Sequence, residues 1–339
     1  DTTWSRGLGD VYKRQALVDT QFKVTHKLID ELGLVIDQMN LSSADEQAPI
    51  IERLRAENAE SVSDCGGSAT NTLVAAASFG AKCSLACVVA NDKDGEMYIS
   101  NLNNIGIDLS GNIRTSFEEP TGKCLILVTP DAKRTMTTAL NISSNLKEED
   151  IDYKNLLNTN MFYIEGYVVT SDYNFNSTLK MLEKCNVDKV PKKALSLSDP
   201  GVVQGFKDRF FEIESYGLDY IFCNEDEALA FSNVSSLNAA IKYFGKKPYI
   251  TVITKGDRGC TIINQEQIID INSEKIKPVD TNGAGDMFAG CFLYALSQGS
   301  SLQYCGEFAN YGAAKLVEKF GPRLDKDGYA QVLKKFKKN

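Results

Sequence analysis

The residues with the clearest chemical content are DTNGAGD at positions 280–286, directly before the apolar stretch MFAGCFLYAL. Gly283 and Gly285 permit positive φ angles and let the backbone approach a ligand closely. A helix that begins here directs free N–H groups, including that of Ala284, and a partial positive charge at the ligand. The pattern predicts an anion hole for a phosphoryl group, with Asp286 at its rim to accept the proton of an attacking hydroxyl. On this segment alone, an aspartate that only caps the helix is the alternative.

DTNGAGD resembles the second signature of the PfkB (ribokinase-like) family of carbohydrate and nucleoside kinases, and the resemblance extends over residues 16 to about 325. The segment DCGGSATNT at 64–72 resembles the first signature of that family. It implies that Gly66, Gly67 and Asn71 bind the hydroxyl groups of the acceptor. The resemblance therefore implies an ATP-dependent kinase that transfers the γ-phosphate to a hydroxyl of a small sugar-containing substrate.

Two further motifs of the family concern the nucleotide and its metal. NEDE at 224–227 resembles the N-x-x-E motif, which implies that Glu227 organises Mg²⁺ through water. TKG at 254–256 resembles a turn that lines the nucleotide site, and Asn310 falls on the late helix beside the adenine, although a position on the helix surface is its alternative. A monovalent cation such as K⁺ near residues 280–286 is a further possibility that the resemblance raises. The expected nucleotide-binding residues are Asn224, Thr254, Lys255, Gly256 and Asn310.

Within the family, the sequence is most similar to adenosine kinases. The similar segments are PTG at 120–122, YIEGY at 163–167 and LSLSDP at 195–200. The segment LVD at 17–19 resembles an L-x-D whose aspartate holds two ribose hydroxyls, which suits the two acceptor oxygens of Asp19. The expected reaction is phosphorylation of the 5'-hydroxyl of adenosine.

Two departures from the adenosine kinase pattern leave other acceptors open. The usual Gly-x-Gly-Asn before L-x-D is replaced by KRQA at 13–16, and Val168 stands where animal adenosine kinases place a second aromatic residue. A sugar kinase of the ribokinase, fructokinase or ketodeoxygluconate kinase type is the first alternative. A non-catalytic ligand-binding homologue is the second. A nicotinamide dehydrogenase is excluded because no G-x-G-x-x-G follows the first strand.

Composition narrows the class of protein further. A net charge of −8 and a pI near 5 argue against a nucleic-acid binder, because phosphate backbones are bound mainly by clustered Lys and Arg. The nine cysteines are scattered and form no C-x-x-C pair, which favours reduced thiols in a cytoplasmic protein. No apolar run reaches the roughly 20 residues that span a bilayer, so no membrane partner is expected. The composition does not decide the oligomeric state, and both a monomer and a homodimer are compatible with it.

Strand-like and helix-like segments alternate along most of the chain, which predicts a doubly wound, mostly parallel sheet with helices on both faces. We expect one ribokinase-like kinase domain over residues 16–339, preceded by an atypical N-terminal segment, 1–15, that is exposed upstream of Val11. Two stretches, about 17–55 and 112–140, instead resemble short strands with charged connections. They predict a small β-sheet lid that closes over the substrate. Arg134 in the second stretch is either a ligand of phosphate or a solvated charge.

Overall fold

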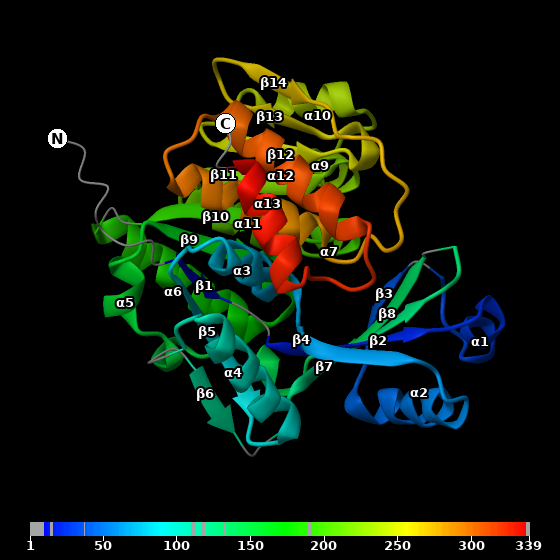
Figure 1. Ribbon diagram of the computed structural model, residues 1–339. Helices are drawn as coiled ribbons and strands as arrows, with labels where there is room; N and C mark the ends of the chain where they lie inside the picture. The colour runs from blue at the N-terminus through cyan, green and yellow to red at the C-terminus, as the bar shows by residue number, and fades with distance from the viewer. Residues whose placement is uncertain are drawn as a thin grey trace.

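The computed structural model describes residues 10–13, 16–36, 38–109, 113–116, 119–131, 133–188 and 191–336, and these form two sheets (Figure 1). The large sheet has nine strands in the order β14-β13-β12-β11-β10-β9-β1-β5-β6. The strands from β6 to β12 pair in parallel, and β13 and β14 are antiparallel. The strands are β1 (Asp10–Lys13), β5 (Cys83–Ala90), β6 (Ile113–Ser116), β9 (Met161–Glu165), β10 (Lys192–Ser196), β11 (Tyr220–Asn224), β12 (Ile250–Thr254), β13 (Cys260–Ile263) and β14 (Ile268–Ile271).

Helices cover both faces of the large sheet, as the sequence predicts. Successive side chains of a strand point to opposite faces, so Phe162 and Ile164 of β9 pack in one core and Tyr163 in another. The Tyr163 core is covered by α3 (Ser68–Ser78), α4 (Lys93–Ile105), α11 (Ala284–Ser297), α12 (Leu302–Val317) and α13 (Lys326–Phe336). The other core is covered by α5 (Tyr153–Leu157), α6 (Asp172–Asp188), α7 (Pro200–Gly205), α8 (Lys207–Ser215), α9 (Glu225–Ser232) and α10 (Leu237–Phe244). The chain also contains short 3-10 turns, which are η1 (Asn141–Ser144), η2 (Glu148–Asp150), η3 (Gly166–Thr170) and η4 (Gly256–Arg258).

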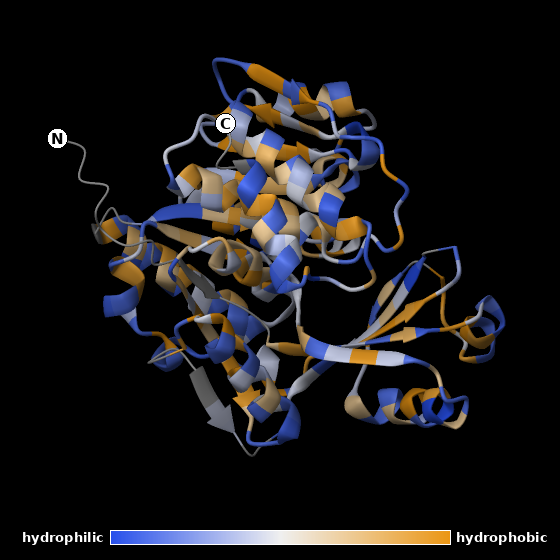
Figure 2. Ribbon diagram, in the orientation of Figure 1, coloured by the Kyte–Doolittle hydropathy of each residue, from blue (hydrophilic) through white to orange (hydrophobic). Residues whose placement is uncertain are grey.

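The small sheet projects from one side of this body (Figure 1). Its order is β3-β8-β7-β2-β4, formed by β2 (Leu17–Lys23), β3 (Met39–Leu41), β4 (Ser61–Gly66), β7 (Gly122–Val128) and β8 (Arg134–Ala139). Its own apolar cluster, which includes Phe22, Ile29 and Leu125, is packed with residues of α1 (His26–Glu31) and α2 (Ala44–Ala56). Hydrophobic and hydrophilic residues are mixed along this sheet and its helices (Figure 2).

The structure differs from the predicted bounds of the small sheet in three respects. The segment 17–55 contains two helices as well as strands, and α2 begins with a capping box between Ser43 and Glu46. β4 lies beyond residue 55, yet it pairs with β2 over Leu17 to Phe22. β6 falls inside 112–140 but pairs with β5 of the large sheet. These pairings depend on contacts between distant segments, which the local alternation of residues does not specify.

The predicted N-terminal boundary also differs from the structure. β1 lies between β5 and β9 in the middle of the large sheet, so residues 10–13 belong to the domain predicted to start at residue 16. Residues 1–9, 14 and 15 lie outside the described part of the chain, and the exposure expected upstream of Val11, over residues 1–10, stays a prediction. Within the residues that the structure describes, no helix is long and apolar enough to cross a membrane.

Candidate active site

A pocket of about 270 Å³, here called the inter-sheet pocket, lies between the small sheet and the body. The small sheet contributes Asp19 and Arg134, and the body contributes Asn71 and residues 281–286. Several polar residues reach it from the carboxyl ends of parallel strands, among them Glu165 at the end of β9 and Asn224 at the end of β11. Such an edge of an α/β sheet is where ligands bind in this class of fold.

The predicted anion hole lies at the N-terminus of α11. Gly283 precedes the helix with a φ of +72°, and a Cβ at this position would lie 2.6 Å from the Pro322 carbonyl oxygen. Glycine is therefore required both by the backbone angle and by the space. The Ala284 N–H is already bonded to the Thr281 carbonyl at 3.3 Å. The anion hole consequently depends on the N–H groups after Ala284, beginning with Gly285.

The Asp286 carboxylate is held by two side chains from the first turn of α3. Ser68 Oγ donates to Asp286 Oδ1 at 2.6 Å, and Asn71 Nδ2 donates to Oδ2 at 3.0 Å. The two helices approach closely because Gly290 of α11 lies against Ala75, where a Cβ would come within 2.6 Å of the alanine methyl group. These two donors thus fix the orientation of the Asp286 carboxylate. Ser68 was not among the predicted site residues, although it directly follows the Gly66-Gly67 turn.

Arg323 is a second residue that the sequence did not reveal. Its guanidinium is buried and donates from Nε to Asn71 Oδ1 at 3.0 Å. It also donates to the Asp64 carboxylate at 3.3 Å and to the Cys65 carbonyl. The bond from Nε occupies the Asn71 carbonyl, so the amide nitrogen faces Asp286. Arg323 lies in a loop that contains no recognisable motif. The nearest feature of the sequence that marks this loop is the adjacent Pro322, whose backbone packs against Gly283.

Three of the four predicted acceptor-binding residues line the inter-sheet pocket, and the fourth, Gly66, packs against one of them. Asp19 of β2 is 8% exposed, and its Oδ2 accepts from the Gly67 N–H at 3.2 Å. A Cβ on Gly66 would lie 1.8 Å from Asp19 Cγ, so any other residue there would displace the carboxylate. Asp19, Gly67 and Asn71 line the pocket together.

Glu227 and Asn224 form a capping box at the N-terminus of α9. The Asn224 N–H and Nδ2 donate to the two Glu227 carboxylate oxygens at 3.0 and 2.8 Å. Burial raises the pKa of Glu227 to about 8; the Asn224 N–H opposes this rise and the charges of Asp199 and Asp286 add to it. The effect of burial on this pKa is larger than that of the hydrogen bond, because Glu227 is only 6% exposed.

A cavity of about 110 Å³ connects Glu227 with Gly285 and Asp286. Mg²⁺ prefers oxygen ligands and retains several of its waters. The two carboxylates therefore suit a hydrated magnesium ion beside the anion hole. The Asp280 carboxylate, by contrast, accepts three N–H donors, from Gln21, Asn282 and Gly321 at 2.7, 2.9 and 2.9 Å. These three bonds fix the Asp280 carboxylate at the start of the loop 280–286, and the monovalent ion near this loop stays a prediction.

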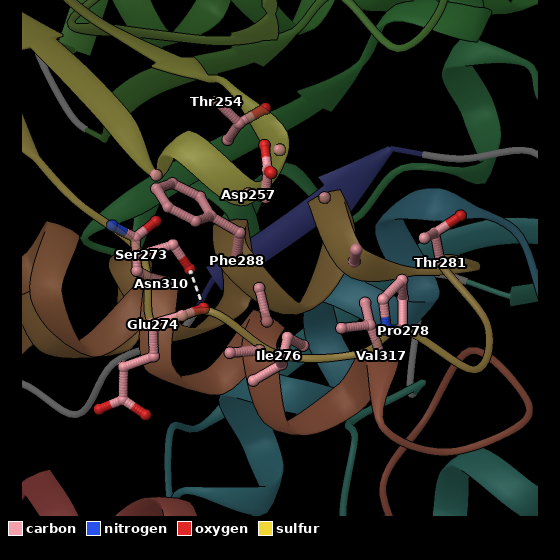
Figure 3. A pocket seen from close by; sticks show the side chains of 16 residues that line it. Thr254, Asp257, Ser273, Glu274, Ile276, Pro278, Thr281, Phe288, Asn310 and Val317 are labelled. Atoms are coloured by element: carbon pink, nitrogen blue, oxygen red, sulfur yellow. Dashed lines mark hydrogen bonds between the residues drawn. The ribbon is translucent and has the colours of Figure 1, made fainter.

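The predicted nucleotide site lies on the other side of the anion hole. A pocket of about 240 Å³ has an apolar interior with Phe288 on one side and Ile276 and Val317 on the other (Figure 3). Of the five predicted nucleotide-binding residues, Thr254, Gly256 and Asn310 line this pocket.

The other two predicted nucleotide-binding residues point elsewhere. Lys255 Nζ donates to Asp270 Oδ1 at 2.8 Å, and Lys255 does not line the nucleotide pocket. Asn224 lines the inter-sheet pocket and the small cavity at Glu227. The nucleotide pocket and the inter-sheet pocket meet at the start of α11. Among the described residues, they share the lining residues Thr281, Ala284 and Gly285. A phosphoryl group at the anion hole would therefore be reached from both pockets.

Comparisons with known proteins identify the family and the fold of this chain. The family model "pfkB family carbohydrate kinase" matches residues 31–327. Adenosine kinase of Schizosaccharomyces pombe is 26% identical, with 70% of this chain and 74% of that protein aligned, and ribokinase of Mus musculus is 27% identical, with 76% and 79% aligned. The crystal structure of adenosine kinase from Sinorhizobium meliloti has a TM-score of 0.88 and 24% identity, covering 97% of this chain and 99% of that one.

The structural match confirms the predicted doubly wound fold, and the family match confirms the predicted class of enzyme. The family match contains Ser68, Asn71 and Asp286 and the residues that line the nucleotide pocket, whereas β2 with Asp19 lies before it. The chain belongs to the pfkB family of carbohydrate kinases and is an ATP-dependent phosphotransferase that acts on a hydroxyl group.

Proposed function

We propose that this protein phosphorylates the 5'-hydroxyl of adenosine with ATP. The observation that carries the choice of a nucleoside is the apolar wall of the inter-sheet pocket, to which the small sheet contributes Leu17, Met39, Ile126 and Met136. A free sugar would lose hydrogen bonds to water against such a wall, whereas a purine has two apolar faces. Adenosine kinases among the relatives and the similar structures support the same choice.

In this proposal the ribose lies against Asp19, Gly67 and Asn71, and the base lies against the small sheet. Asp286 accepts the proton of the 5'-hydroxyl as its oxygen attacks the γ-phosphate. The N–H groups at the start of α11 stabilise the negative charge that develops on the phosphoryl oxygens. The small sheet acts as a lid that excludes water from the transfer.

ATP and Mg²⁺ would occupy the sites that fit them. The apolar pocket formed by Ile276, Phe288 and Val317 would hold the adenine, and the phosphates would extend toward Gly285. Glu227 would order the waters of the magnesium ion, which supplies charge neutralisation at the phosphates. A requirement for K⁺ near residues 280–286 stays a prediction.

A sugar kinase is the second candidate, because the mouse ribokinase matches about as well as the adenosine kinases do. Turnover with a panel of acceptors separates the two. Adenosine is expected to give a kcat/KM about tenfold or more above ribose, fructose or ketodeoxygluconate, since only a nucleoside uses the apolar wall. A free sugar at the top of the panel would favour the sugar kinase.

Two variants sharpen this test. Asp19→Ala is expected to lower kcat/KM for adenosine about 30-fold or more, because the two ribose hydroxyls lose their charged acceptor, and to affect acceptors without cis hydroxyls less. Met136→Gln, which keeps the side-chain length, is expected to lower kcat/KM several-fold for adenosine and to leave ribose unchanged. Equal losses for both acceptors in Met136→Gln would contradict the placement of the base.

Glu227 leads to a prediction about magnesium and pH. Metal binding favours the ionised carboxylate, whose pKa is about 8 in the metal-free protein, so the magnesium concentration for half-maximal turnover is expected to fall as the pH rises from 6 to 8. Glu227→Gln removes the charge, and we expect it to raise that concentration about tenfold and to abolish its pH dependence. An unchanged magnesium titration in the variant would count against the proposed role.

A further inference from the structure

Asn282 has a buried amide nitrogen that nothing in the fold explains. The residue is 8% exposed and lines the inter-sheet pocket beside Gly283. Its Oδ1 accepts a hydrogen bond from the Arg134 guanidinium at 2.9 Å. Its Nδ2 is buried and has no hydrogen-bond partner among the described residues. Buried polar groups are normally satisfied, so a donor without an acceptor at the wall of a pocket indicates an acceptor atom on the ligand.

Hydrogen bonds to the side chain and to the backbone of Asn282 fix the orientation of this amide. A flip of the side chain would place the NH₂ group against the guanidinium of Arg134, donor against donor. The backbone is held by Asp280, whose Oδ1 accepts from the Asn282 N–H at 2.9 Å. Asp280 is itself fully buried and bonded through Oδ2 to Gln21 of β2 at 2.7 Å. The donor is therefore pre-organised before any ligand binds.

The surroundings of the donor select an anionic oxygen. The Arg134 guanidinium lies beside the amide, and Gly283, Ala284 and Gly285 follow it at the positive end of the α11 dipole. All of these residues line the same pocket. A hydroxyl is a poor match for such a cluster, because a neutral group gains less from it than a phosphate oxygen.

We propose that Asn282 Nδ2 donates a hydrogen bond to an oxygen of the phosphoryl group in transfer, while Arg134 holds the amide in place. The proton stays on the nitrogen, and the bond stabilises charge on the oxygen. The inference rests on the phosphoryl-transfer part of the proposed function and does not depend on which acceptor is phosphorylated. Asn282 would then be a catalytic residue from a side chain, beside the backbone anion hole.

Binding of two nucleotides without an acceptor tests this inference. Mg·AMP-PNP carries a γ-phosphoryl group and Mg·ADP does not, and calorimetry measures the Kd of each. Asn282→Ala is expected to weaken AMP-PNP binding about tenfold, consistent with loss of one hydrogen bond to a charged group, and to change ADP binding less than about twofold. Asn282→Asp has the same shape but carries a negative charge, so its loss of AMP-PNP affinity is expected to be larger still.

Asn104→Asp, on the exposed side of α4, is the matched control for added charge and is expected to change neither Kd. Equal losses for AMP-PNP and ADP would mean that Asn282 only supports the loop and would overturn the inference. Unchanged nucleotide affinities with a raised acceptor KM would overturn it as well, in favour of a bond to the acceptor. If the acceptor is not adenosine, the acceptor panel will show it, and the nucleotide affinities of the Asn282 variants will still be as expected.

Discussion

Replacing Asp286 with asparagine is expected to lower kcat about 10³-fold, while the KM for the acceptor changes less than about threefold. The amide cannot take the proton of the attacking hydroxyl, and proton acceptance is needed only in the transition state. Binding of the ground state is retained because the bond between the Gly67 N–H and Asp19 does not involve Asp286. Steady-state kinetics with saturating magnesium and ATP measure both quantities.

The local network can accommodate this substitution, which makes the result interpretable. The new amide oxygen can accept from Asn71 Nδ2, and the new NH₂ group can donate to Ser68 Oγ, since a hydroxyl both donates and accepts. An unchanged thermal unfolding midpoint is the control. Ser68→Ala removes one of the two donors and is expected to cost about tenfold in kcat. Turnover of Asp286→Asn within a few-fold of the parent would exclude this residue as the base.

The sequence allowed prediction of those parts of the site whose chemistry is local. Residues 280–286 combine two glycines with a following apolar helix, and the structure has α11 beginning at Ala284. The alternation of strands and helices after residue 80 likewise led to the correct sheet and its two layers of helices. The resemblance predicted Gly66 as a residue that binds the acceptor, whereas in the structure Gly66 lies against the Asp19 carboxylate and does not line the inter-sheet pocket.

Contacts between distant segments could not be predicted in the same way. Arg134 and Asn282 are 148 residues apart, and Arg323 and Asn71 are 252 apart, so no local pattern links them. Lys255 fits a known motif, but its Nζ pairs with Asp270 of the neighbouring hairpin, which only the register of β13 and β14 brings close. The helices of the small sheet were missed because their apolar residues face a small cluster rather than the main core.

Arg323 carries the second large prediction. Arg323→Met is expected to lower kcat about 10²-fold, with a smaller change in the KM for ATP. The guanidinium Nε holds the Asn71 carbonyl, and without it the amide can turn its NH₂ group away from Asp286. The Asp286 carboxylate would then lose the Asn71 donor and with it part of its fixed direction. Arg323→Lys is expected to restore little, because an ammonium group cannot reproduce the planar fork of donors.

If Arg323 only stabilised the fold, the variants would show a different pattern of kcat and unfolding midpoint. Two comparisons between variants distinguish this role from positioning of the base. Asp64→Asn removes the charge partner of Arg323 but keeps the shape, so it is expected to lower the unfolding midpoint and to change kcat less than about threefold. In the double-mutant cycle, Arg323→Met is expected to add almost nothing to Asn71→Ala, since both act through one hydrogen bond to Asp286. Additive losses in kcat, or an Asp64→Asn variant as slow as Arg323→Met, would show that Arg323 stabilises the fold without positioning the base.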